Sequence, residues 1–203
     1  EFIEELKDEV NISFAHTTAG YDVAKKGYDM GACHATHLYN AMPAFAHRDP
    51  GVIGAARDSE HVYVELICDG IHLHPSTVRA TFEMFGDDRV VMISDSMRAT
   101  GLDDGEYTLG GQKVNVTGKL ATLVSDGAIA GSCTHLMDCV RTAVKDMGIP
   151  LESTVICATA NAAKSVGIYD TCGSITVGKR ADLLLLDEEL NLKKIIMRGE
   201  IIS

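Results

Sequence analysis

The sequence lacks the features that mark disulfide-rich, membrane and secreted proteins. Its six cysteines form no C-x-x-C pair and several lie in apolar or helical runs, so we expect free thiols in a reducing compartment. No apolar run approaches the ~20 residues that a membrane span needs. Residues 1–9 are acidic and amphipathic, unlike a signal peptide. These absences predict a cytoplasmic protein that does not bind membranes.

Basic residues are scarce as well. Lys and Arg number 18 against 29 Asp and Glu, and the resulting net charge of −11 disfavours nucleic acid as a partner. An anionic substrate would therefore have to be held by a few local cations. The 203 residues are 46% hydrophobic, enough for a core in one large or two small domains. The chain does not begin with methionine and opens inside an expected helix, so we expect it to be a piece of a longer protein.

Short apolar runs alternate with helical stretches over residues 1–98. We expect strands over 11–15, 32–38, 62–68 and 89–94, and helices that end at Gly31 and Gly86. Strands that are apolar throughout indicate a sheet covered on both faces, and intervening helices indicate parallel βα units. The later residues predict antiparallel hairpins over 107–124, helices over 134–147 and 151–166, and strands over 181–186 and 194–197.

Polar side chains follow the expected strands at intervals of about one βα unit. His16, His37, His72 and Asp95 each lie just past a strand, and the carboxyl ends of parallel strands meet at one face. Alone, each would more often be structural, for example a loop cap. Together, His16 and His37 predict a Zn²⁺ or Fe²⁺ site, and Asp95 beside it is a candidate general base.

Two further histidines and an arginine lie near these positions in the sequence. His34 cannot share a strand face with His37, and His37 lies nearer the strand end, so we choose His37 for the site. His74 is interpreted as structural, because Pro75 follows it. Arg48 lies in an expected loop and could be a solvated surface residue, but it is the best candidate for binding an anion, because a guanidinium can bind phosphate through two parallel hydrogen bonds.

Several motifs resemble the second half of bacterial N-acetylglucosamine-6-phosphate deacetylases, in the amidohydrolase superfamily. The resemblance covers nearly the whole chain. Its specific parts are Thr36-His-Leu-Tyr-Asn-Ala-Met-Pro and His47-Arg-Asp-Pro-Gly, whereas the tail from Gly173 to Asp187 is shared widely among amidohydrolases. The other matching segments are His16-Thr-Thr-Ala, Asp69-Gly-Ile-His, Ser94-Asp-Ser-Met-Arg-Ala-Thr-Gly, Ile129-Ala-Gly-Ser and Thr159-Ala-Asn-Ala-Ala-Lys.

This resemblance implies hydrolysis of N-acetylglucosamine 6-phosphate by a metal-dependent homodimer. His16 and His37 would be ligands of a divalent metal (Zn or Fe), and Asp95 the general acid and base. The residues implied to bind substrate are Asn40, Ala41, Arg48 and His72, with the arginine reaching across a dimer interface. The implied fold is strands five to eight of a (β/α)8 TIM barrel over residues 1–168, with a β-hairpin insertion at about 105–127. Residues 169–203 would add the C-terminal strands of a small β-sandwich domain.

The same resemblance places some essential parts upstream of Glu1. They include the family's glutamate metal ligand and the histidine that polarises the amide carbonyl. Four strands of a barrel would leave two open edges and an apolar inner face, so residues 1–203 alone are expected to dimerise or aggregate and to lack activity. Two rival interpretations remain: another amidohydrolase of the dihydroorotase or imidazolone type, or a non-catalytic fragment that binds a sugar phosphate or only self-associates.

Overall fold

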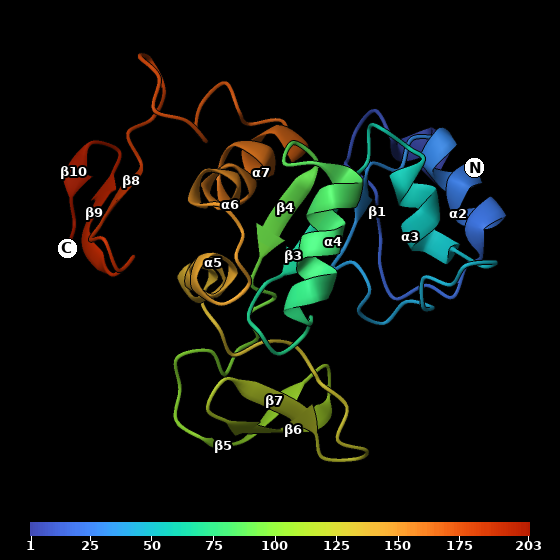
Figure 1. Ribbon diagram of the computed structural model, residues 1–203, viewed down its shortest axis with the longest axis horizontal. Helices are drawn as coiled ribbons and strands as arrows, with labels where there is room; N and C mark the ends of the chain where they lie inside the picture. The colour runs from blue at the N-terminus through green and yellow to red at the C-terminus, as the bar shows by residue number, and fades with distance from the viewer.

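The computed structural model describes residues 1–203 and contains a four-stranded parallel sheet, as the sequence predicts. The strands lie side by side in chain order, and Figure 1 shows helix α4 packed across them. They are β1 (Ser13–Phe14), β2 (His34–Ala35), β3 (Tyr63–Ile67) and β4 (Val90–Ile93). The first helices are α1 (Phe2–Leu6), α2 (Tyr21–Asp29), α3 (Gly51–Arg57) and α4 (Pro75–Phe85). This alternation confirms the predicted βα units.

The main core lies between one face of this sheet and the helices. It contains 25 buried residues, and the β3 and β4 side chains in it point to the same face because strand residues alternate. Val64 and Val90, which are register partners, are both fully buried in this core. Burying side chains of this size contributes about 1.5–3 kcal/mol each, so this layer holds the βα units together.

The other face of the sheet is partly polar, so the expectation of an apolar inner face is wrong. Ser13, His34 and Tyr63 are register partners across β1, β2 and β3, and Glu65 shares their face two residues further along β3. The run over residues 62–68 is apolar except for Glu65, and its side chains alternate between the core and this second face. The predicted open edges are present, because β1 and β4 each have one neighbour in the sheet.

A second, antiparallel sheet follows β4 and confirms the predicted hairpins. Its strands are β5 (Gly105–Leu109), β6 (Gln112–Thr117) and β7 (Leu120–Leu123). Its small core of six buried residues is separate from the main one and includes Val114 and Val116. In Figure 1 this sheet lies beyond the carboxyl ends of the parallel strands, the end where the expected site residues gather.

The C-terminal part differs from the prediction at one point. The helix expected over 151–166 is broken at Thr159, which has φ −132° and ψ −78° and separates α6 from α7. These elements are α5 (Leu136–Lys145), α6 (Leu151–Ala158), α7 (Ala160–Ser165), β8 (Leu183–Leu186), β9 (Leu192–Met197) and β10 (Glu200–Ile201). The last three form an antiparallel sheet, seen at the far left of Figure 1. It confirms two predicted strands and adds β10.

The cysteines and the helices agree with two simpler expectations. All six cysteines are free, and Cys68, Cys139 and Cys157 are buried. Burial raises the pKa of Cys139 to about 11, so its thiol stays protonated and unreactive near neutrality. None of the helices is long and apolar enough to cross a bilayer.

Candidate functional site

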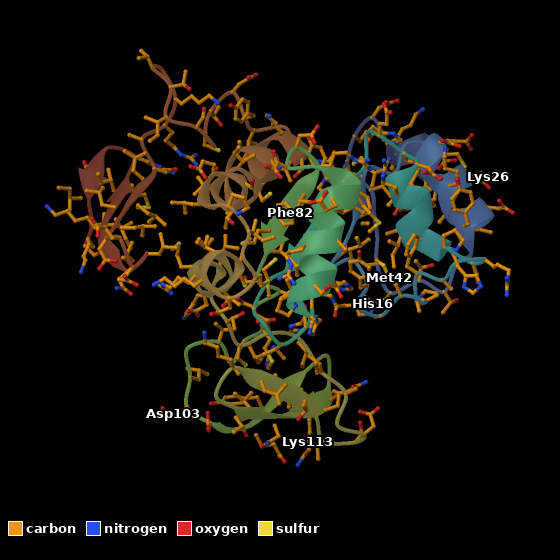
Figure 2. All side chains as sticks on the ribbon, in the orientation of Figure 1. His16, Lys26, Met42, Phe82, Asp103 and Lys113 are labelled. Carbon is orange, nitrogen blue, oxygen red and sulfur yellow. The ribbon has the colours of Figure 1, made fainter.

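The rings of His16 and His37 meet at the carboxyl ends of β1 and β2. Their Nε2 atoms are 2.9 Å apart, and the rings are nearly perpendicular, with centroids 4.7 Å apart. His37 is buried and its Nδ1 has no hydrogen-bond partner, whereas His16 is exposed. Figure 2 shows His16 at the edge of the main body that faces the β5–β7 sheet. The pair predicted from strand spacing is therefore together in space.

The backbone at these strand ends is strained. His16, His37 and Asp95 are each the second residue after a strand, and their φ angles of 47°, 33° and 51° lie in the left-handed region that non-glycine residues rarely adopt. Such outliers cost of order 1–3 kcal/mol each and tend to cluster at functional sites. The strain is repeated at the three positions that were selected for their chemistry, which supports a shared site.

Asp95 leaves β4 at the same end of the sheet. Its side chain is exposed and forms no hydrogen bond or ion pair within the chain, while its backbone carbonyl accepts a hydrogen bond from the Ser132 amide at 3.0 Å. That bond links the end of β4 to the segment that leads into α5. Asp95 thus has a fixed backbone and a free carboxylate, as a proton carrier requires.

The loop after His37 presents free backbone amides. Tyr39 and Ala41 have φ angles of 76° and 53°, and their amides have no hydrogen-bond acceptor within the chain. The amide of Asn40 instead donates to the His37 carbonyl at 3.0 Å, and its side-chain amide donates to the Leu38 carbonyl at 3.3 Å. Successive amides in such irregular loops can bind anions. Of the two loop residues implied to bind substrate, Ala41 offers a free amide and Asn40 shapes the turn.

The loop after β3 contributes a carboxylate–imidazole pair. Asp69 Oδ2 lies 2.8 Å from His72 Nδ1, and the His72 ring borders a groove of about 670 Å³ that Tyr39 and Met42 also line. Burial would raise the pKa of Asp69, but hydrogen bonds from the His72 ring and from the amides of His72 and Ile71 together lower it. The carboxylate is therefore ionised at neutral pH.

Asp69 was not among the residues selected from the sequence. It follows β3 at the same two-residue offset as the other strand-end candidates. That repeated offset is the signal that could have found it, because the motif that contains it drew attention only to His72.

Arg48 lies in a different hollow from His72. It is exposed and borders a depression of about 640 Å³ with Tyr21, Asp49 and Asp58, where the Tyr21 hydroxyl donates to Asp58 at 2.8 Å. Arg48 itself has no ion-pair partner within the chain. Within one chain, Arg48 and His72 are not brought together.

The donor set fits part of a metal site. Two imidazole nitrogens 2.9 Å apart can both lie within the ~2.0–2.1 Å bonding distance of one Zn²⁺ ion. The chain brings together no group of three histidine, cysteine or carboxylate side chains suited to a metal. His16 and His37 thus suit two ligand positions, and a complete coordination shell needs further donors.

Comparisons with known proteins agree with this geometry. The model of the amidohydrolase family matches residues 1–202. N-acetylglucosamine-6-phosphate deacetylase from Bacillus subtilis is 43% identical over 202 residues, which are 99% of this chain and 51% of that protein. N-acetylgalactosamine-6-phosphate deacetylase from Escherichia coli O157:H7 is 33% identical over 99% of this chain and 53% of that protein.

A solved structure gives the same result for the fold. The crystal structure of N-acetylglucosamine-6-phosphate deacetylase from Pasteurella multocida superposes with a TM-score of 0.94 at 32% identity, over 100% of this chain and 53% of that one. The chain thus spans about half the length of the relatives it matches.

Proposed function

This chain belongs to the amidohydrolase family, and from that premise we propose that the complete protein hydrolyses N-acetylglucosamine 6-phosphate to glucosamine 6-phosphate and acetate. The observation that carries the proposal is the pair of Nε2 atoms of His16 and His37, 2.9 Å apart at the ends of neighbouring strands. The Bacillus subtilis deacetylase, 43% identical over nearly the whole chain, supports this choice of substrate.

His16 and His37 would hold a divalent metal, Zn or Fe, together with donors outside these residues. When bound, such an ion acts as a Lewis acid that polarises the amide carbonyl and activates water near neutral pH. Both histidines have left-handed φ angles, their rings meet edge to face, and the burial of His37 limits its motion. The chain's own contribution here is to fix two ligands before the ion arrives.

Asp95 would act as the general base and then as the general acid. Its carboxylate accepts a proton from the attacking water and returns it to the departing amine, so the same group serves both halves of the reaction. Its side chain is free of other partners, and the bond from the Ser132 amide holds its backbone in place. These two properties support the assignment.

The substrate phosphate would bind at the loop after His37. The free amide of Ala41 offers a hydrogen-bond donor, Asn40 supports the turn, and His72 faces the adjoining groove. Arg48 borders a separate hollow, so we propose that it serves the site of the second subunit in a homodimer. Local donors of this kind are needed because the net charge of −11 repels an anion.

We further propose that β1–β4 are strands five to eight of a (β/α)8 barrel, with a barrel region over 1–168 and β8–β10 in a small β domain over 169–203. The superposition on the Pasteurella multocida deacetylase, with a TM-score of 0.94, supports this placement. In such a barrel the site lies at the carboxyl ends of the strands, where the residues above gather.

N-acetylgalactosamine 6-phosphate is a second candidate substrate. The Escherichia coli relative named for that activity is 33% identical to this chain, and the two sugars differ only in the configuration at C4.

A substrate panel tests these assignments on the complete, metal-loaded protein. Acetate release should be fastest with N-acetylglucosamine 6-phosphate, slower with the galactosamine isomer and slowest with unphosphorylated N-acetylglucosamine. Ring opening of dihydroorotate or of an imidazolone without acetate release would favour the rival amidohydrolase activities. A metal-loaded protein that binds the sugar phosphate and hydrolyses nothing would reject the enzymatic proposal.

A further inference from the structure

The Asp69–His72 pair beside the groove is buried, and both oxygens of its carboxylate are hydrogen-bonded. The Asp69 side chain is 0% exposed and that of His72 is 6% exposed. Asp69 Oδ1 accepts hydrogen bonds from the backbone amides of Ile71 at 2.9 Å and His72 at 3.0 Å, and Oδ2 lies 2.8 Å from His72 Nδ1. Both carboxylate oxygens are therefore engaged within one short loop.

This contact fixes where the first proton of the His72 ring resides. An ionised carboxylate can only accept hydrogen bonds, so the nitrogen that faces it must carry a proton. The hydrogen bonds to Asp69 outweigh its burial and keep its pKa below the usual range, so the carboxylate is ionised across neutral pH. The neutral ring is thus the Nδ1–H tautomer, which leaves a lone pair on Nε2.

The second ring nitrogen is free. His72 Nε2 has no hydrogen-bond partner within the chain, and His72 lines the 670 Å³ groove together with Tyr39, the residue before the Asn40–Ala41 turn. A lone pair would repel a phosphate oxygen, so the ring can donate to phosphate only when Nε2 also carries a proton.

We propose that Asp69 is a positioning residue for substrate binding: it holds the Nδ1 proton of His72 and so leaves Nε2 as the ring nitrogen that contacts the 6-phosphate, as a donor when the ring is doubly protonated. This inference rests on the proposed function, since it takes the phosphate ester as the ligand. It adds a role for Asp69, which reaches the substrate only through His72.

The replacement Asp69→Asn makes the proposal testable, because it keeps the size of the side chain. If the amide oxygen of asparagine accepts the two backbone amides, its NH₂ group must face Nδ1, which then has to be an acceptor. The neutral ring would move its proton to Nε2. ¹⁵N NMR of the complete protein labelled at histidine distinguishes the two tautomers, and we expect Nδ1–H in the wild type and Nε2–H in the variant.

A second carboxylate–histidine pair provides a matched control. Glu65 Oε1 lies 3.4 Å from His34 Nδ1 on the polar face of the sheet, and neither residue borders the groove. Glu65→Gln should change the signals of His34 and leave those of His72 unchanged. A wild-type His72 ring that is Nε2–H when neutral would overturn the proposal without any variant, so the test does not depend on how well a mutant folds.

Kinetics tests the link to phosphate. Asp69→Ala should raise KM for N-acetylglucosamine 6-phosphate by about 10- to 100-fold, by analogy with carboxylates that orient metal-ligating histidines, and KM for unphosphorylated N-acetylglucosamine by less than about 3-fold. His72→Ala should do the same, and the double variant should be no worse than either single one, because both act through one contact.

The outcomes separate this proposal from the proposed function. Equal KM changes for both sugars, or additive losses in the double variant, would overturn the positioning role while the deacetylase activity stands. A wild type with the expected tautomer but without acetate release would reject the proposed function, and inorganic phosphate would then serve as the probe. Phosphate binding that Asp69→Ala weakens supports the positioning role, whereas unchanged binding overturns it.

Discussion

The two ends of the β1–β4 sheet differ in how their polar groups are satisfied. At the carboxyl ends, His37 Nδ1 has no partner, the carboxylate of Asp95 is free, and strand-end residues adopt left-handed φ angles. At the amino ends, Ser165 O at the end of α7 accepts hydrogen bonds from the side chains of Asn11 at 3.1 Å and His34 at 3.0 Å. The carboxyl ends thus combine strained backbone with free polar groups, whereas the side chains of Asn11 and His34 at the amino ends are hydrogen-bonded.

Arg89 shows the same tendency at the amino end. Its guanidinium donates to four backbone carbonyls around the end of α3, including those of Val62 and Arg57, and it lies 5.1 Å from the centre of the Phe85 ring. A charged group used in this way connects a helix to the sheet. The comparison indicates that substitutions at the carboxyl ends should affect chemistry, and those at the amino ends should affect stability.

The largest effect is expected from the loss of a metal ligand. In the complete protein, His16→Ala or His37→Ala should remove most of the bound metal and nearly all activity, because one lost donor leaves an incomplete shell. Thermal stability of the metal-free forms should change little for His16, which is exposed. Elemental analysis after dialysis measures the metal, and full occupancy in either variant would exclude that residue from the site.

The next effect concerns proton transfer. Asp95→Asn retains the shape of the side chain but cannot take a proton, so kcat should fall by roughly 10²–10⁴-fold while the metal is retained. Steady-state kinetics and metal analysis on the same sample separate the two quantities. A kcat within tenfold of the wild type would place the general base elsewhere, and Asp103→Asn, at an exposed acidic residue in the loop before β5, is the matched control.

The sequence predicted the strongly apolar elements well. The observed β3 and β4 lie within one residue of the predicted ends, and α4 extends from Pro75 to Phe85 as expected. The break at Thr159 was missed because no glycine or proline marks it. Asn161, two residues later, is fully buried and donates to the carbonyls of Asp87 and Val90, so a tertiary contact fixes the chain there.

The site was predicted as a set of positions but not as a geometry. The spacing of the strands correctly predicted that His16 and His37 lie close together, because parallel strands end at one edge of a sheet. The left-handed backbone at these residues leaves no mark in the sequence, because such conformations are imposed by the surrounding structure. The position of Arg48 in a hollow apart from His72 could not be predicted either, because it depends on how its loop packs.

A smaller effect is expected from Arg48. Arg48→Ala should weaken the use of N-acetylglucosamine 6-phosphate by about 10- to 150-fold, the value of a charge-assisted hydrogen bond of ~1.5–3 kcal/mol, and spare unphosphorylated N-acetylglucosamine. In a homodimer that shares this residue, mixing Arg48→Ala with inactive Asp95→Asn subunits should restore part of the activity. Equal losses on both substrates would make Arg48 structural.

The smallest effect is a pH dependence of stability at the amino ends. Burial alone would lower the pKa of His34, but its contacts with the Glu65 carboxylate and the Ser165 carbonyl outweigh burial and raise the pKa above 6.5. The folded state therefore binds this proton more tightly than the unfolded state does. The resulting stabilisation is complete below pH ~6.5, the ordinary value for histidine, and is lost as the pH rises through the folded pKa.

Glu65→Gln removes the charge that retains this proton, so the stability of the variant should depend less on pH across that window. The expected loss at acid pH is on the order of 1 kcal/mol, or about 2–4 °C in Tm, because one hydrogen bond to a charged group is weakened. KM for the sugar phosphate should not change, since neither His34 nor Glu65 borders the groove. Thermal unfolding between pH 5.5 and 8.5 measures the effect against the wild type. A variant that loses activity at unchanged Tm would contradict the division between the two ends of the sheet, because it would give an amino-end pair a role in the chemistry.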